Sequence, residues 1–88
     1  KKERTKKMKI YNIDNLREFI GNNIEKIKEI KITSVKDIDY HPMAGYTYLA
    51  NVKLTLNSGR YKMYKAMFNS SYLEEYEDPK DFAEDYLI

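Results

Sequence analysis

The carboxylates near the C-terminus are the residues of this chain whose type and spacing most clearly suggest a function. Residues 71–88 read SYLEEYEDPKDFAEDYLI and contain seven acidic side chains against one base, Lys80. The acids are Glu74, Glu75, Glu77, Asp78, Asp81, Glu84 and Asp85. Residues 1–10, KKERTKKMKI, contain six bases and one acid, so the formal net charge of +2 conceals two oppositely charged ends. An acidic surface that also carries tyrosines can occupy a site built for nucleic acid.

Catalytic and metal-binding chemistry has little support in the composition. The chain has one histidine and no cysteine, and a hydrolytic nucleophile needs a base that a third group holds in place. His41 precedes Pro42 in a predicted surface loop, and the three glycines form no phosphate-binding loop. Magnesium sites usually collect carboxylates from different elements, whereas these acids belong to one segment. We therefore expect no enzyme activity, no cofactor and no metal.

Two predicted strands offer a second kind of binding surface. Their basic residues alternate with tyrosines, and basic strands with aromatic side chains can hold phosphates and stack bases. These candidate nucleic-acid-binding residues are Lys53, Arg60, Lys62 and Lys65. Lysines on the solvent side of an antiparallel strand are also ordinary surface residues. The alternative function is a small DNA- or RNA-binding accessory domain that uses this basic hairpin.

Part of the acidic charge has a local explanation. Asp78 before Pro79 is typical of an N-cap followed by the first residue of a helix. Glu84 and Asp85 would lie toward the end of that helix, where negative charge is unfavourable. The helix therefore gains nothing from these two acids, which suggests either a solvated surface or a cationic partner.

The elements that position these residues follow from the apolar pattern. Apolar residues recur at three- and four-residue steps from Ile13 to Ile30, which predicts a helix capped by Asp14 or Asn15 and kinked or split near Gly21. Three strands are expected at residues 32–40, 46–56 and 60–68, and the second alternates strictly. Asn57-Ser58-Gly59 provides a tight turn between the last two strands.

The C-terminal region is predicted to be helical again. Ser71 and Glu74 have the spacing of a capping box, and a last helix begins at Asp78-Pro79. The expected fold is α+β, a two-layer αβββα(α) domain in which helices pack on one face of a three-stranded antiparallel sheet. The length of 88 residues fits a single domain over residues 10–88. Residues 1–9 are expected to be a flexible basic tail or an expression remnant, with Met8 as a candidate natural start.

The sequence suggests an intracellular, cytoplasmic protein. No apolar run approaches the roughly 20 residues that span a bilayer. The basic start is not followed by the apolar region of a signal peptide. The absence of cysteine also suits an intracellular protein.

Two stretches resemble a known family. The order αβββαα at this length is similar to the small type II-A anti-CRISPR proteins of phages and prophages, which inhibit Cas9. Residues 11–20, YNIDNLREFI, resemble the Asn-Ile-Asn-Asp-Leu-type start of that family. Residues 75–78, EYED, followed by Asp81, Phe82 and Asp85, resemble its acidic segment.

The resemblance implies a function and a partner. In that family an acidic surface mimics DNA and occupies the cleft in which Cas9 reads the protospacer-adjacent motif with arginines. Arginine forks match carboxylates well. By this resemblance the partner-binding residues are Glu75, Tyr76, Glu77, Asp78, Asp81 and Asp85, and the charge pattern adds Glu84. The expected protein is a phage or mobile-element inhibitor that binds Cas9 or another nucleic-acid enzyme in a stoichiometric complex.

The two functions predict different surfaces. If the C-terminal acids gather into one patch while the lysines of the hairpin scatter, the inhibitor is favoured. A continuous basic face on the sheet favours nucleic-acid binding instead.

Overall fold

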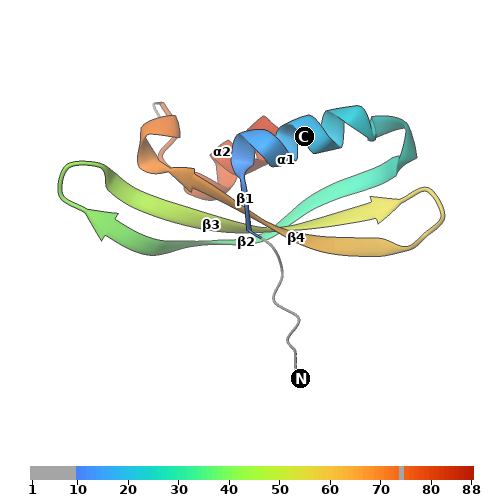
Figure 1. Cartoon of the computed structure of the whole chain (residues 1–88), viewed down its shortest axis with the longest axis horizontal. Helices are drawn as coiled ribbons and strands as arrows, with labels where there is room; N and C mark the ends of the chain where they lie inside the picture. Colours follow the sequence, from blue (N-terminus) through green and yellow to red (C-terminus); the bar gives the residue numbers. More distant parts are fainter. Residues whose placement is uncertain (1–9, 74) are drawn as a thin grey trace, which may run out of the picture.

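A four-stranded sheet is covered by helices on one of its two faces (Figure 1). The computed structural model describes residues 10–73 and 75–88, so the expected basic tail and Glu74 lie outside the described residues. The elements in chain order are β1 (Ile10–Asn12), α1 (Ile13–Asn22), the 3-10 turn η1 (Ile24–Lys26), β2 (Ile27–His41), β3 (Gly45–Leu56), β4 (Tyr61–Asn69), the 3-10 turn η2 (Ser70–Tyr72) and α2 (Pro79–Leu87).

The sheet is mixed, and the predicted three-stranded antiparallel sheet is wrong. The strand order is β1-β4-β3-β2, in which β1 pairs with β4 in parallel and the other neighbours are antiparallel. The sequence did not indicate β1, because a strand of three residues is too short to show alternation. The α+β class and the packing of helices on one face agree with the prediction.

Helix α1 begins earlier than predicted. The side chain of Asn12 caps it by accepting a hydrogen bond of 2.8 Å from the backbone N–H of Asp14, so neither Asp14 nor Asn15 is the cap. Ile13, Leu16 and Ile20 are buried under the helix. Asn12 is also the last residue of β1, so the strand leads directly into the helix.

The predicted helix was expected to continue to Ile30 but ends at Asn22, near the glycine that the sequence marked as a break. Ile27 and Ile30 belong to β2, where they lie opposite Leu56 and Leu54. The register shifts three times along β2, and one shift falls directly after Ile27. A bulge inserts one extra residue into a strand, so two residues three apart can point to the same face. Bulges therefore gave β2 a spacing that resembled a helix.

The hairpin of β3 and β4 confirms the alternation that the sequence predicted for its first strand. Ala50, Val52 and Leu54 are buried on β3, and Ala66 lies directly opposite Ala50 on β4. Gly59 has a φ of +95° in the turn, a conformation that side chains rarely adopt. The odd-numbered residues of β3 consequently point to the face that the helices leave uncovered.

The described part of the C-terminal region contains one α-helix, α2, where one bent helix or two short helices were expected. Where the capping box predicts a helix, the chain forms η2, whose start is capped by Asn69 through a 2.8 Å hydrogen bond from the N–H of Ser71. The predicted cap of the last helix is confirmed, because Asp78 accepts a 2.9 Å hydrogen bond from the N–H of Lys80. Phe82, Ala83 and Leu87 of α2 are buried in the core.

The core fills the space between the sheet and the two helices. Within the described ranges no charged or polar side chain is buried. Twelve residues of the described part of the chain are buried: Ile13, Leu16, Ile20, Ile32, Ala50, Val52, Leu54, Ala66, Phe68, Phe82, Ala83 and Leu87. Neither α1 nor α2 has the length and apolar character needed to cross a membrane.

Candidate functional site

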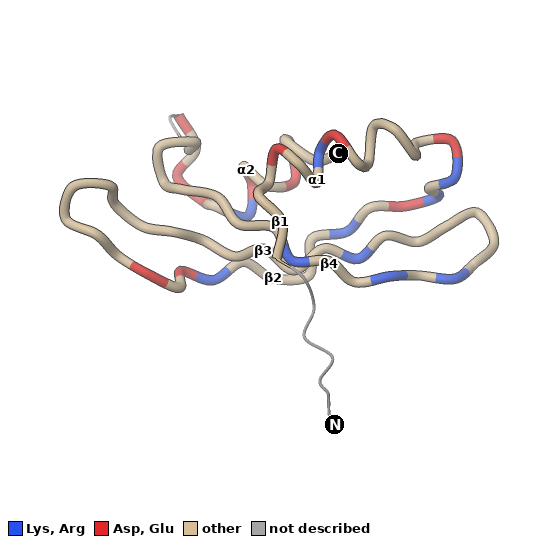
Figure 2. Tube along the Cα trace, in the orientation of Figure 1, with Lys and Arg blue, Asp and Glu red and all other residues tan. Residues whose placement is uncertain are grey.

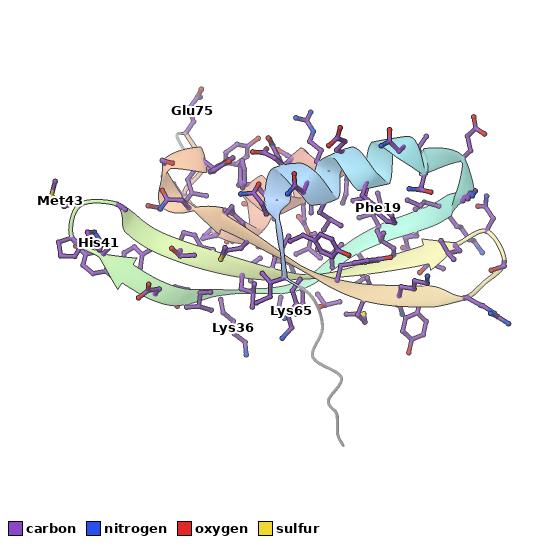
Figure 3. The ribbon with its side chains drawn as sticks, viewed as in Figure 1. Phe19, Lys36, His41, Met43, Lys65 and Glu75 are labelled. Atoms are coloured by element: carbon purple, nitrogen blue, oxygen red, sulfur yellow. The ribbon has the colours of Figure 1, made fainter. Side chains whose placement is uncertain are left out.

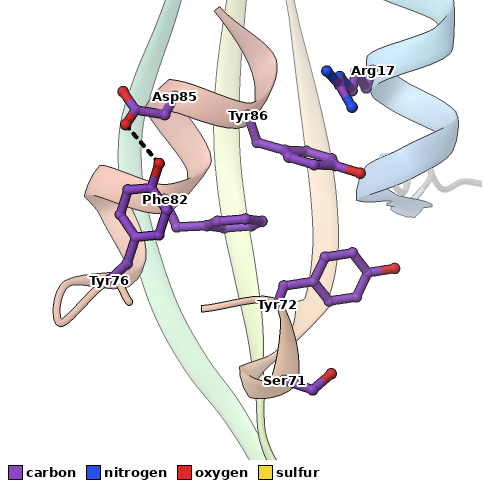
Figure 4. Close-up of a pocket in the computed structure, with 7 residues that line it drawn as sticks. All are labelled: Arg17, Ser71, Tyr72, Tyr76, Phe82, Asp85 and Tyr86. Atoms are coloured by element: carbon purple, nitrogen blue, oxygen red, sulfur yellow. Dashed lines mark hydrogen bonds between the residues drawn. The ribbon is translucent and has the colours of Figure 1, made fainter. Parts of the chain in front are cut away.

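A groove on the helix side brings together the start of α1, the turn η2 and one flank of α2. Its volume is about 510 Å³. The residues that line it are Arg17, Ser71, Tyr72, Tyr76, Phe82, Asp85 and Tyr86 (Figure 4). Two of the seven residues predicted to bind a partner, Tyr76 and Asp85, line this groove.

Tyr76 and Asp85 form the acidic wall of the groove. The Tyr76 hydroxyl donates a 2.8 Å hydrogen bond to a carboxylate oxygen of Asp85 (Figure 4). This bond raises the pKa of Tyr76, and the negative charges of Glu75 and Asp81 add to the effect of Asp85. Acids from the loop after η2 and from α2 therefore gather around one tyrosine. We call Glu75, Tyr76, Asp81 and Asp85 the acidic flank.

Asp14 forms a second centre that the sequence analysis considered only as a helix cap. One carboxylate oxygen accepts a 2.7 Å hydrogen bond from the Tyr72 hydroxyl, and the other accepts the Tyr86 hydroxyl. These two hydrogen bonds hold the pKa of Asp14 below its ordinary value, and the bond from Tyr86 has the larger effect. In return, Asp14 raises the pKa of both tyrosines. The network ties α1 to η2 and α2.

Arg17 supplies a positive charge beside this network. Its guanidinium carbon lies 4.5 Å from the centre of the Tyr86 ring, a cation–π distance. The same charge also favours the ionised form of Asp14. One end of the groove is therefore cationic, whereas the acidic flank lies at the other (Figure 4).

Aromatic packing fixes the shape of the groove. Phe82 is buried at its base, and its ring centre lies 5.1 Å from that of Tyr86, 5.6 Å from that of Tyr76 and 5.9 Å from that of Tyr72. The first pair is stacked and the other two meet edge to face. Such pairs restrict side-chain rotation, so the three hydroxyl groups are held in place at the surface.

The other predicted partner-binding residues are less concentrated. Glu77 and Asp78 are exposed in the loop before α2, and the Asp78 carboxylate already caps that helix. Glu84 is half-buried and points about 100° away from Asp85 around α2. Asp85, from which the helix itself was expected to gain nothing, accepts a hydrogen bond from Tyr76 outside the helix. Tertiary contact, not helix position, gives Asp85 its role.

The predicted basic hairpin is divided between two faces. Lys53 and Lys65 point to the open face of the sheet, since they alternate with the buried residues of β3 and β4. Lys62 lies opposite Leu54 and lines a smaller groove on the helix side with Phe19 and Tyr64. Arg60 lies in the turn before β4. The structure thus separates four residues that the sequence placed in one group.

No protein-family model matches this chain, and neither a curated protein nor a solved structure matches it.

A metal site would require several ligand side chains close together. Among residues 10–73 and 75–88, no three His, Asp or Glu side chains come together in an arrangement that could hold a metal ion. His41 is exposed at the end of β2, where its Nδ1 accepts a 3.1 Å hydrogen bond from the N–H of Met43. This histidine therefore shapes the β2–β3 turn.

No sequence pattern pointed to four further members of the site, Asp14, Arg17, Tyr72 and Tyr86. Asp14 and Tyr86 are 72 positions apart in the chain, and no spacing rule connects them. The only signal was the surplus of tyrosines, nine in 88 residues, near a strongly acidic segment. Tyrosine hydroxyls at a protein surface commonly find carboxylate partners.

Proposed function

We propose that this protein is a stoichiometric inhibitor that binds the cationic DNA groove of a nucleic-acid enzyme, with Cas9 as the first candidate target. The acidic flank is the contact surface, and Tyr76 is its aromatic anchor. The protein would act in the cytoplasm of the bacterial cell that contains the enzyme. Neither a cofactor nor a catalytic step is needed, because the inhibitor competes with DNA for one groove.

The observation that carries this proposal is the clustering of charge around Tyr76. Glu75 and Asp81 lie close enough to this hydroxyl to raise its pKa, and Asp85 accepts its hydrogen bond. Glu75 comes from the loop and the other two acids come from α2, so the cluster is a product of folding. Glu75 projects from the helix side of the molecule, away from the open sheet face (Figure 3).

The chemistry of the flank suits arginines of a DNA-reading cleft. Carboxylates can accept paired hydrogen bonds from a guanidinium group, and desolvated pairs of this kind contribute to specificity. A single-sign charge cluster also increases the association rate with a surface of opposite charge. The exposed ring of Tyr76, at 37% of its full accessibility, can pack on an arginine plane.

The division of the hairpin basic residues also favours the inhibitor over the basic-hairpin alternative. Lys62 faces the helix layer and Arg60 occupies a turn, so the four predicted basic residues do not form one surface. This division counts only against the hairpin surface of the alternative, because lysines of β2 share the open face of the sheet with Lys53 and Lys65.

The decisive test measures binding to a Cas9–guide complex and its cleavage of target DNA at two salt concentrations. The acidic-flank variant combines Glu75→Gln and Asp81→Asn of the acidic flank with Glu77→Gln of the adjoining loop. It removes three charges but leaves the Tyr76–Asp85 hydrogen bond intact. We expect each buried pair that is lost to weaken binding by roughly 2–5 kcal/mol, and rim positions to reduce mainly the association rate.

A matched control removes the same charge elsewhere. Glu25→Gln, Glu29→Gln and Asp39→Asn change exposed acids on η1 and β2, away from the acidic flank. This variant should keep full binding and inhibition. Equal losses in both variants, or full inhibition by the acidic-flank variant, would contradict the proposed site. If the wild-type protein does not bind Cas9, a pull-down from host lysate with and without nuclease treatment identifies the enzyme that it does bind.

A further inference from the structure

One face of the sheet is left uncovered by the helices (Figure 1), and basic residues occur along its strands (Figure 2). The strand register places four lysines of β2, β3 and β4 on this open face. Lys53 on β3 and Lys65 on β4 were predicted as basic residues, and β2 adds Lys31 and Lys36. Lys31 lies opposite Lys53, Lys36 lies opposite Leu49, and Lys65 lies opposite Asn51. Because opposite partners point to the same side, all four share the open face. Lys36 and Lys65 point away from the helices (Figure 3).

The arrangement of these charges is unfavourable for the isolated fold. Lys31 and Lys53 are directly opposite each other, and like charges in this position destabilise a sheet. The acids that share the face by register, Glu29 and Asp39, lie opposite Thr55 and Thr47 toward its two ends. The central part of the face therefore has a positive charge that an anionic ligand could neutralise.

Apolar and aromatic side chains lie between the lysines. Met63 is opposite Lys53, Met67 is opposite Leu49, and Ile10 of β1 is opposite Lys65. Tyr61 is 59% exposed at the end of β4, and the amino group of Lys53 lies 4.4 Å from the centre of its ring. The face thus combines cations with a ring and flexible thioethers, which can contact the flat surfaces of nucleobases.

We propose that this open face binds single-stranded nucleic acid. The lysines would neutralise successive phosphates, while Tyr61 and the two methionines would contact bases that are not paired. A sheet surface suits a single strand, whose bases can spread over it, better than a duplex, whose bases are stacked inside. The proposed surface is Lys31, Lys36, Lys53, Tyr61, Met63, Lys65 and Met67. It lies on the opposite side of the sheet from the acidic flank and does not depend on the proposed inhibition.

The test measures fluorescence anisotropy of labelled oligouridine and oligothymidine of about 12 nucleotides, a typical site size, and of duplex DNA of the same length. The full chain is used throughout, so its basic N-terminal residues contribute equally to every sample. The face variant combines Lys31→Gln, Lys53→Gln and Lys65→Gln. The matched control combines Lys26→Gln, Lys62→Gln and Lys80→Gln, which removes the same charge from η1, the helix side of β4, and α2.

We expect the face variant to bind single strands at least about tenfold more weakly at low salt. It should also reduce the slope of log affinity against log salt by about 2, the value for three lost phosphate contacts. The control variant should change affinity by less than about threefold. Tyr61→Ala should weaken binding at least about fivefold, whereas Tyr61→Phe should retain it because stacking needs only the ring. A preference for oligouridine or for oligothymidine identifies the strand as RNA or DNA.

Several results would overturn the proposal. Equal losses in the face and control variants would mean that overall charge alone attracts the strand. If duplex DNA binds as tightly as single strands, the face does not contact unpaired bases. Polyglutamate that binds the face as tightly as the oligonucleotides would assign it to an acidic protein instead. Sedimentation compares the wild-type protein and the face variant without nucleic acid. If the wild type is an oligomer and the face variant is a monomer, the face binds a second copy of the chain. Thermal melts of both triple variants verify that each is folded.

Discussion

The two faces of this molecule use charge in different ways. On the helix side, Asp14, Asp78 and Asp85 each accept hydrogen bonds from the fold itself. On the open sheet side, Lys31 and Lys53 lie opposite each other without an acid between them in the register. The acids therefore contribute to stability as well as to any binding, whereas the lysine pair opposes stability.

This difference determines how each face must be studied. A substitution of Asp14, Asp78 or Asp85 removes an internal hydrogen bond, so a loss of binding could arise from a change of structure. Substitution of a lysine on the open face should leave the fold intact or improve it. On the open sheet face, a lysine substitution that weakens binding while it raises stability therefore indicates a binding residue. On the helix side, the acids to substitute are those that accept no hydrogen bond within the fold.

The largest expected effect tests whether the two faces are assigned correctly along a single strand. Leu54 is buried and its neighbour Lys53 points to the open face. Leu54→Ala should lower the free energy of unfolding by roughly 2–5 kcal/mol. Lys53→Ala should change it by less than about 0.5 kcal/mol. Thermal or urea unfolding of both variants measures the contrast, and similar small effects would mean that the assigned faces of β3 are wrong.

A smaller effect distinguishes the two uses of acids on the helix side. Asp78→Ala removes the N-cap of α2 and should cost about 0.5–2 kcal/mol. Glu77→Ala, one residue earlier in the exposed loop, should leave stability within about 0.5 kcal/mol. Urea unfolding is again the measurement. If Asp78→Ala has no effect, α2 is held by its buried residues alone.

The Asp14 network should make stability depend on pH in a predictable direction. Tyr86→Phe removes one of the two hydroxyls that donate to Asp14 and should cost about 0.5–1 kcal/mol at neutral pH. Tyr61→Phe on the open face is the control and should have no comparable cost. Thermal melts of the wild type and both variants measure the difference.

The penalty of Tyr86→Phe should disappear at both ends of the pH scale. The pKa of Asp14 is lowered in the folded state, so its contribution is present above its unfolded pKa of about 4 and is lost as the pH falls through the folded pKa. The pKa of Tyr86 is raised, so its contribution is present below about pH 10 and is lost as the pH rises through the folded value. A penalty that remains constant from acid to alkaline pH would rule out this network.

The smallest expected effect is a gain. Lys31→Thr removes one member of the like-charge pair on the open face and introduces a residue that favours strands. Stability should rise by about 0.2–1 kcal/mol at low ionic strength and by less in high salt, because salt screens the repulsion. Urea unfolding at two salt concentrations checks this. A loss of stability would show that Lys31 and Lys53 do not repel each other.

Local patterns predicted several elements correctly. The alternation along β3 indicated its buried face, Gly59 marked the turn, and Asp78-Pro79 marked the start of α2. In each case the signal and the structure that it forms lie within a few residues, so no distant contact was needed. The error over Ile27 and Ile30 arose because bulges in a strand can imitate the spacing of a helix.

The sequence also indicated part of the candidate site. Glu75, Tyr76, Asp81 and Asp85 belong to one acidic segment, and folding brings them together as the acidic flank. The basic hairpin was predicted as one group, yet Lys62 lies on the opposite side from Lys53 and Lys65. Adjacent strand residues point to opposite faces, and charge composition alone does not reveal which face is buried.

By itself, the sequence determined what short-range physics controls: the hairpin, the cap of α2, the apolar face of α1 and the concentration of acids near the C-terminus. Only the tertiary structure decided that Ile10–Asn12 pairs in parallel with β4, that Asp14 meets Tyr72 and Tyr86, and that lysines of β2 join those of β3 and β4 on one open face. These relations join residues that are far apart in the chain. The free energy of these contacts depends on how the helices pack on the sheet, and that packing depends on the burial of the whole apolar core.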